Sequence, residues 1–132
     1  MSNRDMSDIL IPEIKIAVET EYLIDQSAPD QNHYVFAYTI TIENNGNIPA
    51  KLLRRHWIIT DANNKIQEVK GEGVIGLQPH ISPNQVFTYS SGAILETPLG
   101  CMQGSYEMVT DEGNEFTSPI PLFRLTSNIV MH

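Results

Sequence analysis

Large apolar side chains occupy every second position of residues 34–42 (YVFAYTITI), and this is the strongest pattern in the chain. Successive side chains of a β-strand point to opposite faces of a sheet, so a period of two predicts a strand with one strongly buried face. The same alternation in residues 14–19 (IKIAVE) predicts an earlier strand. No window of a dozen residues shows a sustained helical period, which favours an all-β chain.

Turn-forming residues separate further segments of this kind. The turn and loop segments are residues 25–32, which contain Pro29, and residues 43–47, 61–64 and 111–114. They delimit predicted strands at residues 51–60, 65–70, 85–90 and 102–110, with a last strand from about Glu115. Turn signals every ten to fifteen residues or so are typical of sandwiches and barrels. We therefore expect a β-sandwich of about seven strands, of immunoglobulin or fibronectin type III kind.

Two of the predicted strands carry more specific expectations. In residues 51–60, strict alternation places Leu53, Arg55, Trp57 and Ile59 on one side and Leu52, Arg54, His56 and Ile58 on the other. Trp57 is a candidate core anchor because a buried tryptophan contributes a large apolar area. In the last strand Pro119 and Pro121 each remove a backbone donor, which predicts a sheet edge or a bulge there.

Length and composition predict one globular domain. The 132 residues are 41% hydrophobic and 18% charged, an ordinary globular balance. We expect a flexible N-terminus at residues 1–10 and a single domain at residues 11–132. The chain has no apolar run of about 20 residues and no apolar stretch at its N-terminus, so we expect neither membrane insertion nor export. The single cysteine, Cys101, cannot form an internal disulfide, and we expect a cytoplasmic protein.

The net charge of −8 argues against a nucleic-acid binder, because phosphate contacts need clustered Lys and Arg. The charge is uneven along the chain. Residues 51–70 hold five basic residues against two acidic ones, a local charge of +3, which leaves −11 for the rest. Such asymmetry could attract an anion or an acidic partner, or it could be an ordinary mixed surface.

Residues 71–76 (GEGVIG) satisfy the G-x-G-x-x-G pattern of dinucleotide-binding sites. In those sites the glycines open a helix whose N-terminus faces the pyrophosphate. Pro79 and Pro83 follow too closely for such a helix, so a Rossmann site is excluded. Two interpretations remain. The glycines could serve a bulge or a tight crossover between strands, or they could form a phosphate-binding nest with nearby cations. The candidate ligand-binding residues are Lys70, Gly71, Gly73, Gly76, Arg54 and Arg55.

Other chemistry has little support in the sequence. The four histidines, His33, His56, His80 and His132, lack the spacing of a local ligand pair, so a zinc site cannot be predicted. A weak magnesium site made from surface acids stays an alternative. Residues 90–92 lack the G-x-S-x-G elbow, and Cys101 has no adjacent base or cations to stabilise a thiolate. We expect no catalytic residue and no cofactor.

Two long segments resemble the ApaG family. They are residues 54–63 (RRHWIITDAN) and residues 71–79 (GEGVIGLQP), and residues 87–92 and 104–108 continue the likeness. Asn84 differs from the family, which usually has glycine after the proline, and Ala93 differs after the Ser-Gly pair. The resemblance covers essentially the whole chain after the first dozen residues.

The resemblance implies a fibronectin type III-like sandwich and a bacterial cytosolic protein linked to cobalt and magnesium efflux or resistance. Similar domains stand beside others in eukaryotic proteins, which implies a protein-protein interaction module with an unidentified protein partner. The alternatives are binding of a small anionic ligand such as pyrophosphate or diadenosine tetraphosphate at the glycine segment, and direct binding of a divalent metal. Exposed sheet edges also make a homodimer plausible.

Overall fold

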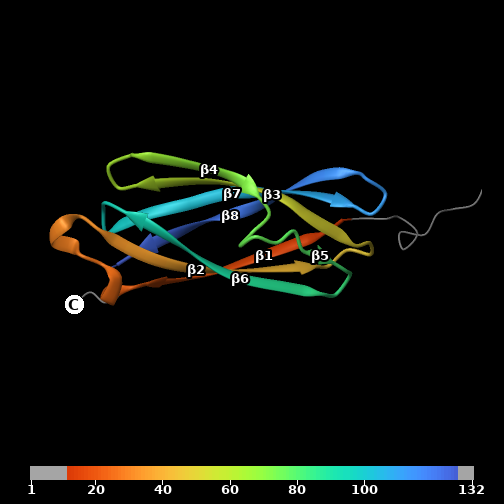
Figure 1. Cartoon of the computed structure of the whole chain (residues 1–132), viewed down its shortest axis with the longest axis horizontal. Helices are drawn as coiled ribbons and strands as arrows, with labels where there is room; N and C mark the ends of the chain where they lie inside the picture. Colours follow the sequence, from red (N-terminus) through yellow and green to blue (C-terminus); the bar gives the residue numbers. More distant parts are fainter. Residues whose placement is uncertain (1–11, 128–132) are drawn as a thin grey trace, which may run out of the picture.

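Two antiparallel β-sheets pack face to face in the computed structural model, which describes residues 12–127 (Figure 1). The strands are β1 (Ile14–Tyr22), β2 (Tyr34–Asn44), β3 (Ala50–Asp61), β4 (Ile66–Glu72), β5 (His80–Ile81), β6 (Val86–Leu95), β7 (Leu99–Thr110) and β8 (Glu115–Thr126). One sheet has the order β1-β2-β6 and the other β4-β3-β7-β8, with β5 pairing with β3. The predicted all-β sandwich is confirmed, and its finer assignment to the fibronectin type III class stays a prediction.

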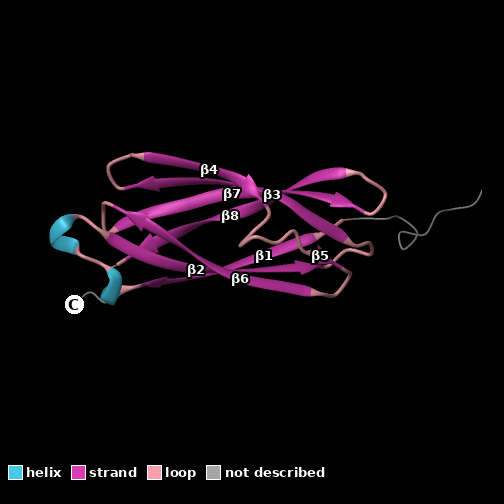
Figure 2. Cartoon of the chain, viewed as in Figure 1, coloured by secondary structure: helices cyan, strands magenta, loops and turns pink. Residues whose placement is uncertain are grey.

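The loop between β1 and β2 contains the helical turns of the described chain, two short 3-10 helices (Figure 2). They are η2 (Ile24–Gln26) and η3 (Pro29–Gln31). Within residues 12–127 no helix is long and apolar enough to cross a membrane. The expected flexible segment, residues 1–10, lies outside the described residues.

Trp57 lies at the centre of the core, as the sequence predicts, with 2% of its surface exposed. Its ring packs edge-on against Tyr38 of the opposite sheet at 5.4 Å between centroids. Phe123 and Tyr106 of its own sheet lie 5.8 Å and 6.4 Å away, also edge-on. Edge-to-face packing is a favourable arrangement for aromatic rings. This aromatic cluster therefore holds the two sheets together.

A bulge in β3 makes one sequence prediction wrong. Strict alternation placed Leu52 on the side away from Trp57, yet Leu52 is fully buried in the same core. The register of β3 against β7 shifts between Leu52 and Arg54, so Leu53 is an extra residue. An extra residue in a strand shifts the alternation by one, so that side chains before and after it keep opposite parity but can face the same way. Leu52 and Trp57 therefore both point into the core.

The prediction for the prolines of the last strand is confirmed. β8 is an edge strand of its sheet, and its register against β7 shifts where Ile120 pairs with Gly104 and Phe123 with Met102. Two residues of β8, Pro121 and Leu122, therefore stand opposite one residue of β7. An edge and a bulge are the places in a sheet that tolerate a missing N–H.

The two long sides of the sandwich differ. On one side β1 packs against β8. On the other side β4 and β6 belong to different sheets, and two side-chain contacts connect them near one end: Gln67 Nε2 of β4 donates to the Ile94 carbonyl of β6 at 3.4 Å, and Lys65 Nζ, just before β4, lies 3.2 Å from Glu96 Oε2, just after β6. We call the side between β4 and β6 the open side.

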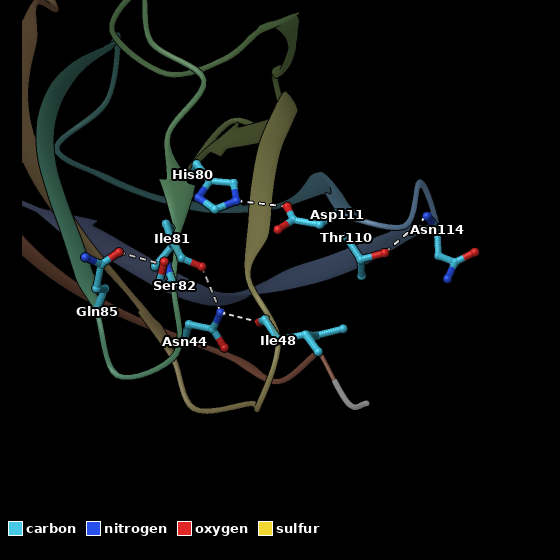
Figure 3. A network of polar contacts seen from close by, with 9 residues as sticks. All are labelled: Asn44, Ile48, His80, Ile81, Ser82, Gln85, Thr110, Asp111 and Asn114. Carbon is cyan, nitrogen blue, oxygen red and sulfur yellow. Dashed lines mark hydrogen bonds and ion pairs between the residues drawn. The ribbon is translucent and has the colours of Figure 1, made fainter. Parts of the chain in front are cut away.

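A buried asparagine fixes the turn between β2 and β3 (Figure 3). The Asn44 side chain is fully buried, and its Nδ2 donates to the carbonyls of Ile48 and Ile81 at 2.8 Å and 2.9 Å. Its Oδ1 accepts from the Gly46 N–H at 2.9 Å. One side chain thus ties β2, the turn and β5 together, and it satisfies backbone groups that water cannot reach.

We expect Asn44→Ala to lower the free energy of unfolding by about 3 kcal/mol, because it leaves buried backbone groups without partners. Asn45→Ala is the matched control, since Asn45 is exposed and bonds through its backbone N–H. Urea denaturation of both variants measures the effect. Equal losses in the two variants would contradict this role of Asn44.

Candidate functional site

The candidate residues of β3 lie on opposite faces of their sheet. Arg54 faces outward, where its Nη2 lies 3.2 Å from Glu115 Oε1. Arg55 pairs in register with Tyr106 and Gly71, and it faces inward at the open side. A hollow of about 430 Å³ at β3, β4 and β7 is lined by Arg54, Arg55, His56, Lys70, Gly71, Glu72 and Glu107. The structure thus brings Arg54, Arg55, Lys70 and Gly71 to one hollow, without Gly73 and Gly76.

Carboxylates offset part of the positive charge at this hollow. His56 Nε2 lies 2.6 Å from Glu68 Oε2, and Lys70 Nζ lies 3.9 Å from the same oxygen. The hydrogen bond from His56 and, secondarily, the charge of Lys70 lower the pKa of Glu68. The hollow is therefore a mixed-charge surface, with Glu72 and Glu107 on its lining.

The glycine segment forms the end of β4 and a tight hairpin. Val74 and Leu77 exchange both backbone hydrogen bonds, at 2.8 Å and 2.9 Å. Between them Ile75 and Gly76 have φ of +43° and +78°, as a two-residue type I′ turn requires. The Gly73 N–H donates to the Leu53 carbonyl at 2.8 Å. Several amides that a phosphate nest would need are thus already bonded, which supports the interpretation of the glycines as a tight crossover.

The Arg55 side chain covers Gly71 at the open side. Its guanidinium lies flat over Gly71, where an added Cβ would meet three guanidinium atoms at 2.8 Å. Arg55 Nη1 donates to the carbonyls of Glu72 and Gly73 at 3.0 Å and 2.9 Å. Within residues 12–127 no carboxylate forms an ion pair with Arg55. Its charge is therefore half-buried and not neutralised by a partner.

A second cavity, of about 300 Å³, opens between the two sheets at the open side, and we call it the inter-sheet cavity. Its lining comprises Tyr38, Arg55, Trp57, Glu72, Val74, Ile75, Gly76, Tyr89 and Ser91. Sequence reasoning placed Arg55 and Gly76 in a site but missed the tyrosines. The sequence did contain a signal for them, namely a tyrosine at inward positions of β2 and β6. A buried tyrosine places a polar hydroxyl in an apolar layer.

The Tyr89 hydroxyl forms a hydrogen bond with the Tyr106 hydroxyl beside this cavity. Burial raises the pKa of Tyr89 to about 12, and it raises the pKa of Tyr106 further. The charge of Arg55 opposes both shifts. Both phenols therefore stay protonated, and act as hydrogen-bond donors, across the physiological pH range.

No three His, Cys, Asp or Glu residues gather into a metal-binding group within the part of the chain that the structure describes. His56 pairs with Glu68, and His80 Nε2 lies 2.9 Å from Asp111 Oδ1 (Figure 3). His132 lies outside the described residues. The arrangement of these residues is that of surface pairs.

The two positive-φ glycines of the segment 71–76 give a direct test of the hairpin. Gly73 has φ +62°, and an added Cβ would lie 2.2 Å from the Leu77 carbonyl oxygen, whereas Gly76 has φ +78° with open space around it. We expect Gly73→Ala to cost about 3 kcal/mol or more and Gly76→Ala about 1 kcal/mol, because only the first adds a backbone clash to the strain. Urea denaturation measures both. Similar losses of unfolding free energy in the two variants would contradict the predicted clash at Gly73, because they would mean that the loop moves to accept the added Cβ.

The buried phenols predict an alkaline loss of stability. An unfolded tyrosine ionises near pH 10, whereas folded Tyr89 and Tyr106 keep their protons above that pH. The raised folded pKa therefore gives full stability below pH 10 and a loss as the pH rises further. Tyr106→Phe removes one such proton. The free energy of unfolding of this variant should therefore fall less steeply between about pH 10 and 11 than that of the unmodified protein, and the two slopes should differ by up to about 1.4 kcal/mol per pH unit. Urea denaturation at pH 8, 10 and 11 measures the slope, and identical slopes in both proteins would contradict the assignment.

Comparison with known proteins gives consistent matches. The family model described as the ApaG domain matches residues 24–110. "Protein ApaG" of Acidithiobacillus ferrooxidans is 54% identical over 127 residues, which cover 96% of this chain and 100% of the relative. "Protein ApaG" of Thiobacillus denitrificans is 56% identical over 120 residues, 91% of this chain and 94% of the relative. Neither name states an enzymatic activity.

Solved structures agree with the fold. A crystal structure of the ApaA protein from Bordetella pertussis superposes with a TM-score of 0.87 at 44% identity, over 89% of this chain and 96% of that chain. A second X-ray structure, from a structural genomics programme, gives a TM-score of 0.84 at 50% identity, over 90% of each chain. At these identities the likeness extends from the fold to the sequence.

Proposed function

The chain belongs to the ApaG domain family, and from that premise we propose that it is a non-enzymatic, cytoplasmic module that binds a partner protein along the open edge of β6. One observation carries the proposal. β6 is a ten-residue edge strand without a charge or a proline, and half of its backbone groups point away from its sheet. Such an edge is a template for an added strand.

The direction of the backbone groups follows from the ladder. The Asn44 N–H donates to the Gln85 carbonyl, so that pair is hydrogen-bonded. Bonding then alternates along an antiparallel pair, which leaves Thr88, Ser90 and Gly92 with backbone groups directed outward. Two contacts agree with this alternation of bonded and outward-directed residues. The Ile94 carbonyl accepts from the Gln67 side chain on the open side, and the Val35 carbonyl accepts from the Leu23 N–H on the opposite edge of β2.

The remaining edges carry features that discourage strand addition. β1 packs against β8, and β8 contains Pro119 and Pro121. β4 carries Glu68, Lys70 and Glu72 along its seven residues. Charges and prolines are the usual protection of an edge. β6 is therefore the edge in the described chain that best suits a partner strand.

The occupant we propose is an extended segment of a partner protein. Side chains on one face of that segment would extend the Ser and Thr surface of the outer face, where Thr39 Oγ1 and Ser90 Oγ lie 2.7 Å apart. Side chains on its other face would point toward the inter-sheet cavity beside Tyr89 and Ser91. The chain carries a net charge of −8, so a neutral or basic segment is favoured.

We further propose that any connection with cobalt and magnesium efflux or resistance runs through this partner. The earlier alternatives stay open to test. Pyrophosphate or diadenosine tetraphosphate binding by Lys70, Gly71, Gly73, Gly76, Arg54 and Arg55 predicts saturable amide shifts at residues 71–76. Direct metal binding predicts uptake of magnesium or cobalt in equilibrium dialysis.

Proline substitution tests the edge. A photo-crosslinking amino acid at Thr88 should capture a partner protein that mass spectrometry identifies. Ser90→Pro should lower the yield of this crosslinked adduct about tenfold. The reason is that proline removes an outward N–H and leaves the hydrogen bonds between β6 and β2 intact. Glu68→Pro makes the same change on the β4 edge and should alter the yield less than about twofold. Near-ultraviolet circular dichroism of Trp57 checks that both variants fold.

Two results would contradict the proposal. One is an unchanged yield in Ser90→Pro, and the other is an equal loss in Glu68→Pro. An adduct of twice the chain mass, formed by the purified protein alone, would assign the edge to a second copy and would favour the homodimer.

A further inference from the structure

Two nearly buried residues of the inter-sheet cavity carry a polar group that has no hydrogen-bond partner among the residues that the structure describes. Tyr38 and Trp57 are 6% and 2% exposed, and both side chains line the cavity. Within residues 12–127 neither the Tyr38 hydroxyl nor the Trp57 indole N–H bonds to another group. Every sealed side-chain nitrogen and oxygen in that range does have a partner. Solvent or a ligand must therefore reach these two groups, and the cavity is the opening that both side chains line.

The tyrosine pair adds a third donor. The hydrogen bond between the Tyr89 and Tyr106 hydroxyls uses one of their two protons, so one proton is left to donate elsewhere. Tyr89 lines the cavity, whereas Tyr106 is fully buried behind it. When Tyr106 donates to Tyr89, the remaining proton is that of Tyr89, at the cavity wall.

Arg55 adds a positive charge to these donors. Its Nη1 bonds to two carbonyl oxygens, and its guanidinium has five N–H donors in all. Among the described residues no carboxylate neutralises it. Glu72 also lines the cavity, and its Oε1 accepts from Gln78 Nε2 at 3.4 Å. The lining thus offers several donors and one unpaired cation, with a single competing carboxylate at its exposed rim.

We propose that the inter-sheet cavity binds a compact oxyanion, a carboxylate or a phosphate group, with Arg55 supplying the charge and Tyr38, Tyr89 and Trp57 supplying hydrogen bonds. An oxyanion accepts several hydrogen bonds at once and is stabilised by an adjacent guanidinium. The volume of about 300 Å³ suits a small group of this kind. This site goes beyond the protein-binding proposal, and it does not use the amides of the glycine segment.

The chain carries its own reporter for this site, because Trp57 is its single tryptophan. Its indole N–H gives one signal in a proton-nitrogen correlation spectrum. Titration with pyrophosphate and, separately, with succinate should move that signal saturably with at least one of the two probes. The probe that acts identifies the oxyanion as phosphate or carboxylate. No saturable movement with either probe at about 10 mM would overturn the proposal.

Matched variants separate the cavity from other anion sites. Tyr38→Phe removes a hydroxyl that has no hydrogen-bond partner in the described part of the chain, and it should weaken binding about tenfold, the loss expected for a hydrogen bond to a charged group. Tyr34→Phe removes a hydroxyl from the same strand outside the cavity and should leave the affinity unchanged. Arg55→Lys keeps the charge without the planar fork and should weaken binding at least as much as Tyr38→Phe. Equal affinities in Tyr38→Phe and Tyr34→Phe, or shifts confined to residues 71–76, would overturn the proposal.

Discussion

The packing of Trp57 against Tyr38 is the contact on which the rest of the structure depends. It joins β3 of one sheet to β2 of the other, with Phe123 and Tyr106 completing the aromatic cluster. The bulge at Leu53 serves this packing, because it lets Leu52 and Trp57 face the same core from one strand. Without that extra residue one end of β3 would turn its apolar side chains to solvent.

The same residues that hold the sheets together also line the candidate site. Tyr38 and Trp57 bury their rings in the core and also line the inter-sheet cavity, and within residues 12–127 the Tyr38 hydroxyl and the Trp57 indole N–H have no hydrogen-bond partner. A core built for stability alone would pair these groups or replace them with apolar side chains. Arg55 adds a half-buried charge at the same place. The open side thus departs from the pattern of a simple core, and such departures are expected at functional sites.

Much of the fold could be predicted from the sequence, because alternation and turn residues are local signals. The strand at residues 34–42, the core position of Trp57 and the edge position of the Pro119 strand all follow from them. The bulge at Leu53 could not be predicted, since it depends on pairing with β7, which is distant in sequence. Asn84 shows an intermediate case: its φ of +70° after Pro83 is a conformation that glycine and asparagine adopt most readily, but only the structure reveals that conformation.

The candidate site was only partly accessible to sequence reasoning. Charge and glycine patterns pointed to Arg55 and the segment 71–76, but not to the face on which each residue lies. Arg54 and Arg55 are neighbours in sequence and lie on opposite faces of the sheet. Tyr38 and Tyr89 come from different strands and meet Arg55 only when the sheets pack. Their polar function depends on which hydroxyl finds a partner, and that is a property of the packed structure.

The central claim is that the outward backbone groups of Thr88, Ser90 and Gly92 leave this part of the β6 edge open to a partner strand. Amide hydrogen exchange of the free protein, resolved by residue with NMR, tests it most directly. The account predicts alternation along β6: fast exchange at Thr88, Ser90 and Gly92, whose N–H groups point outward, and slow exchange at Tyr89, Ser91 and Ala93, which bond to β2. Uniformly slow exchange along β6 would contradict the account, because it would mean that the edge is already covered.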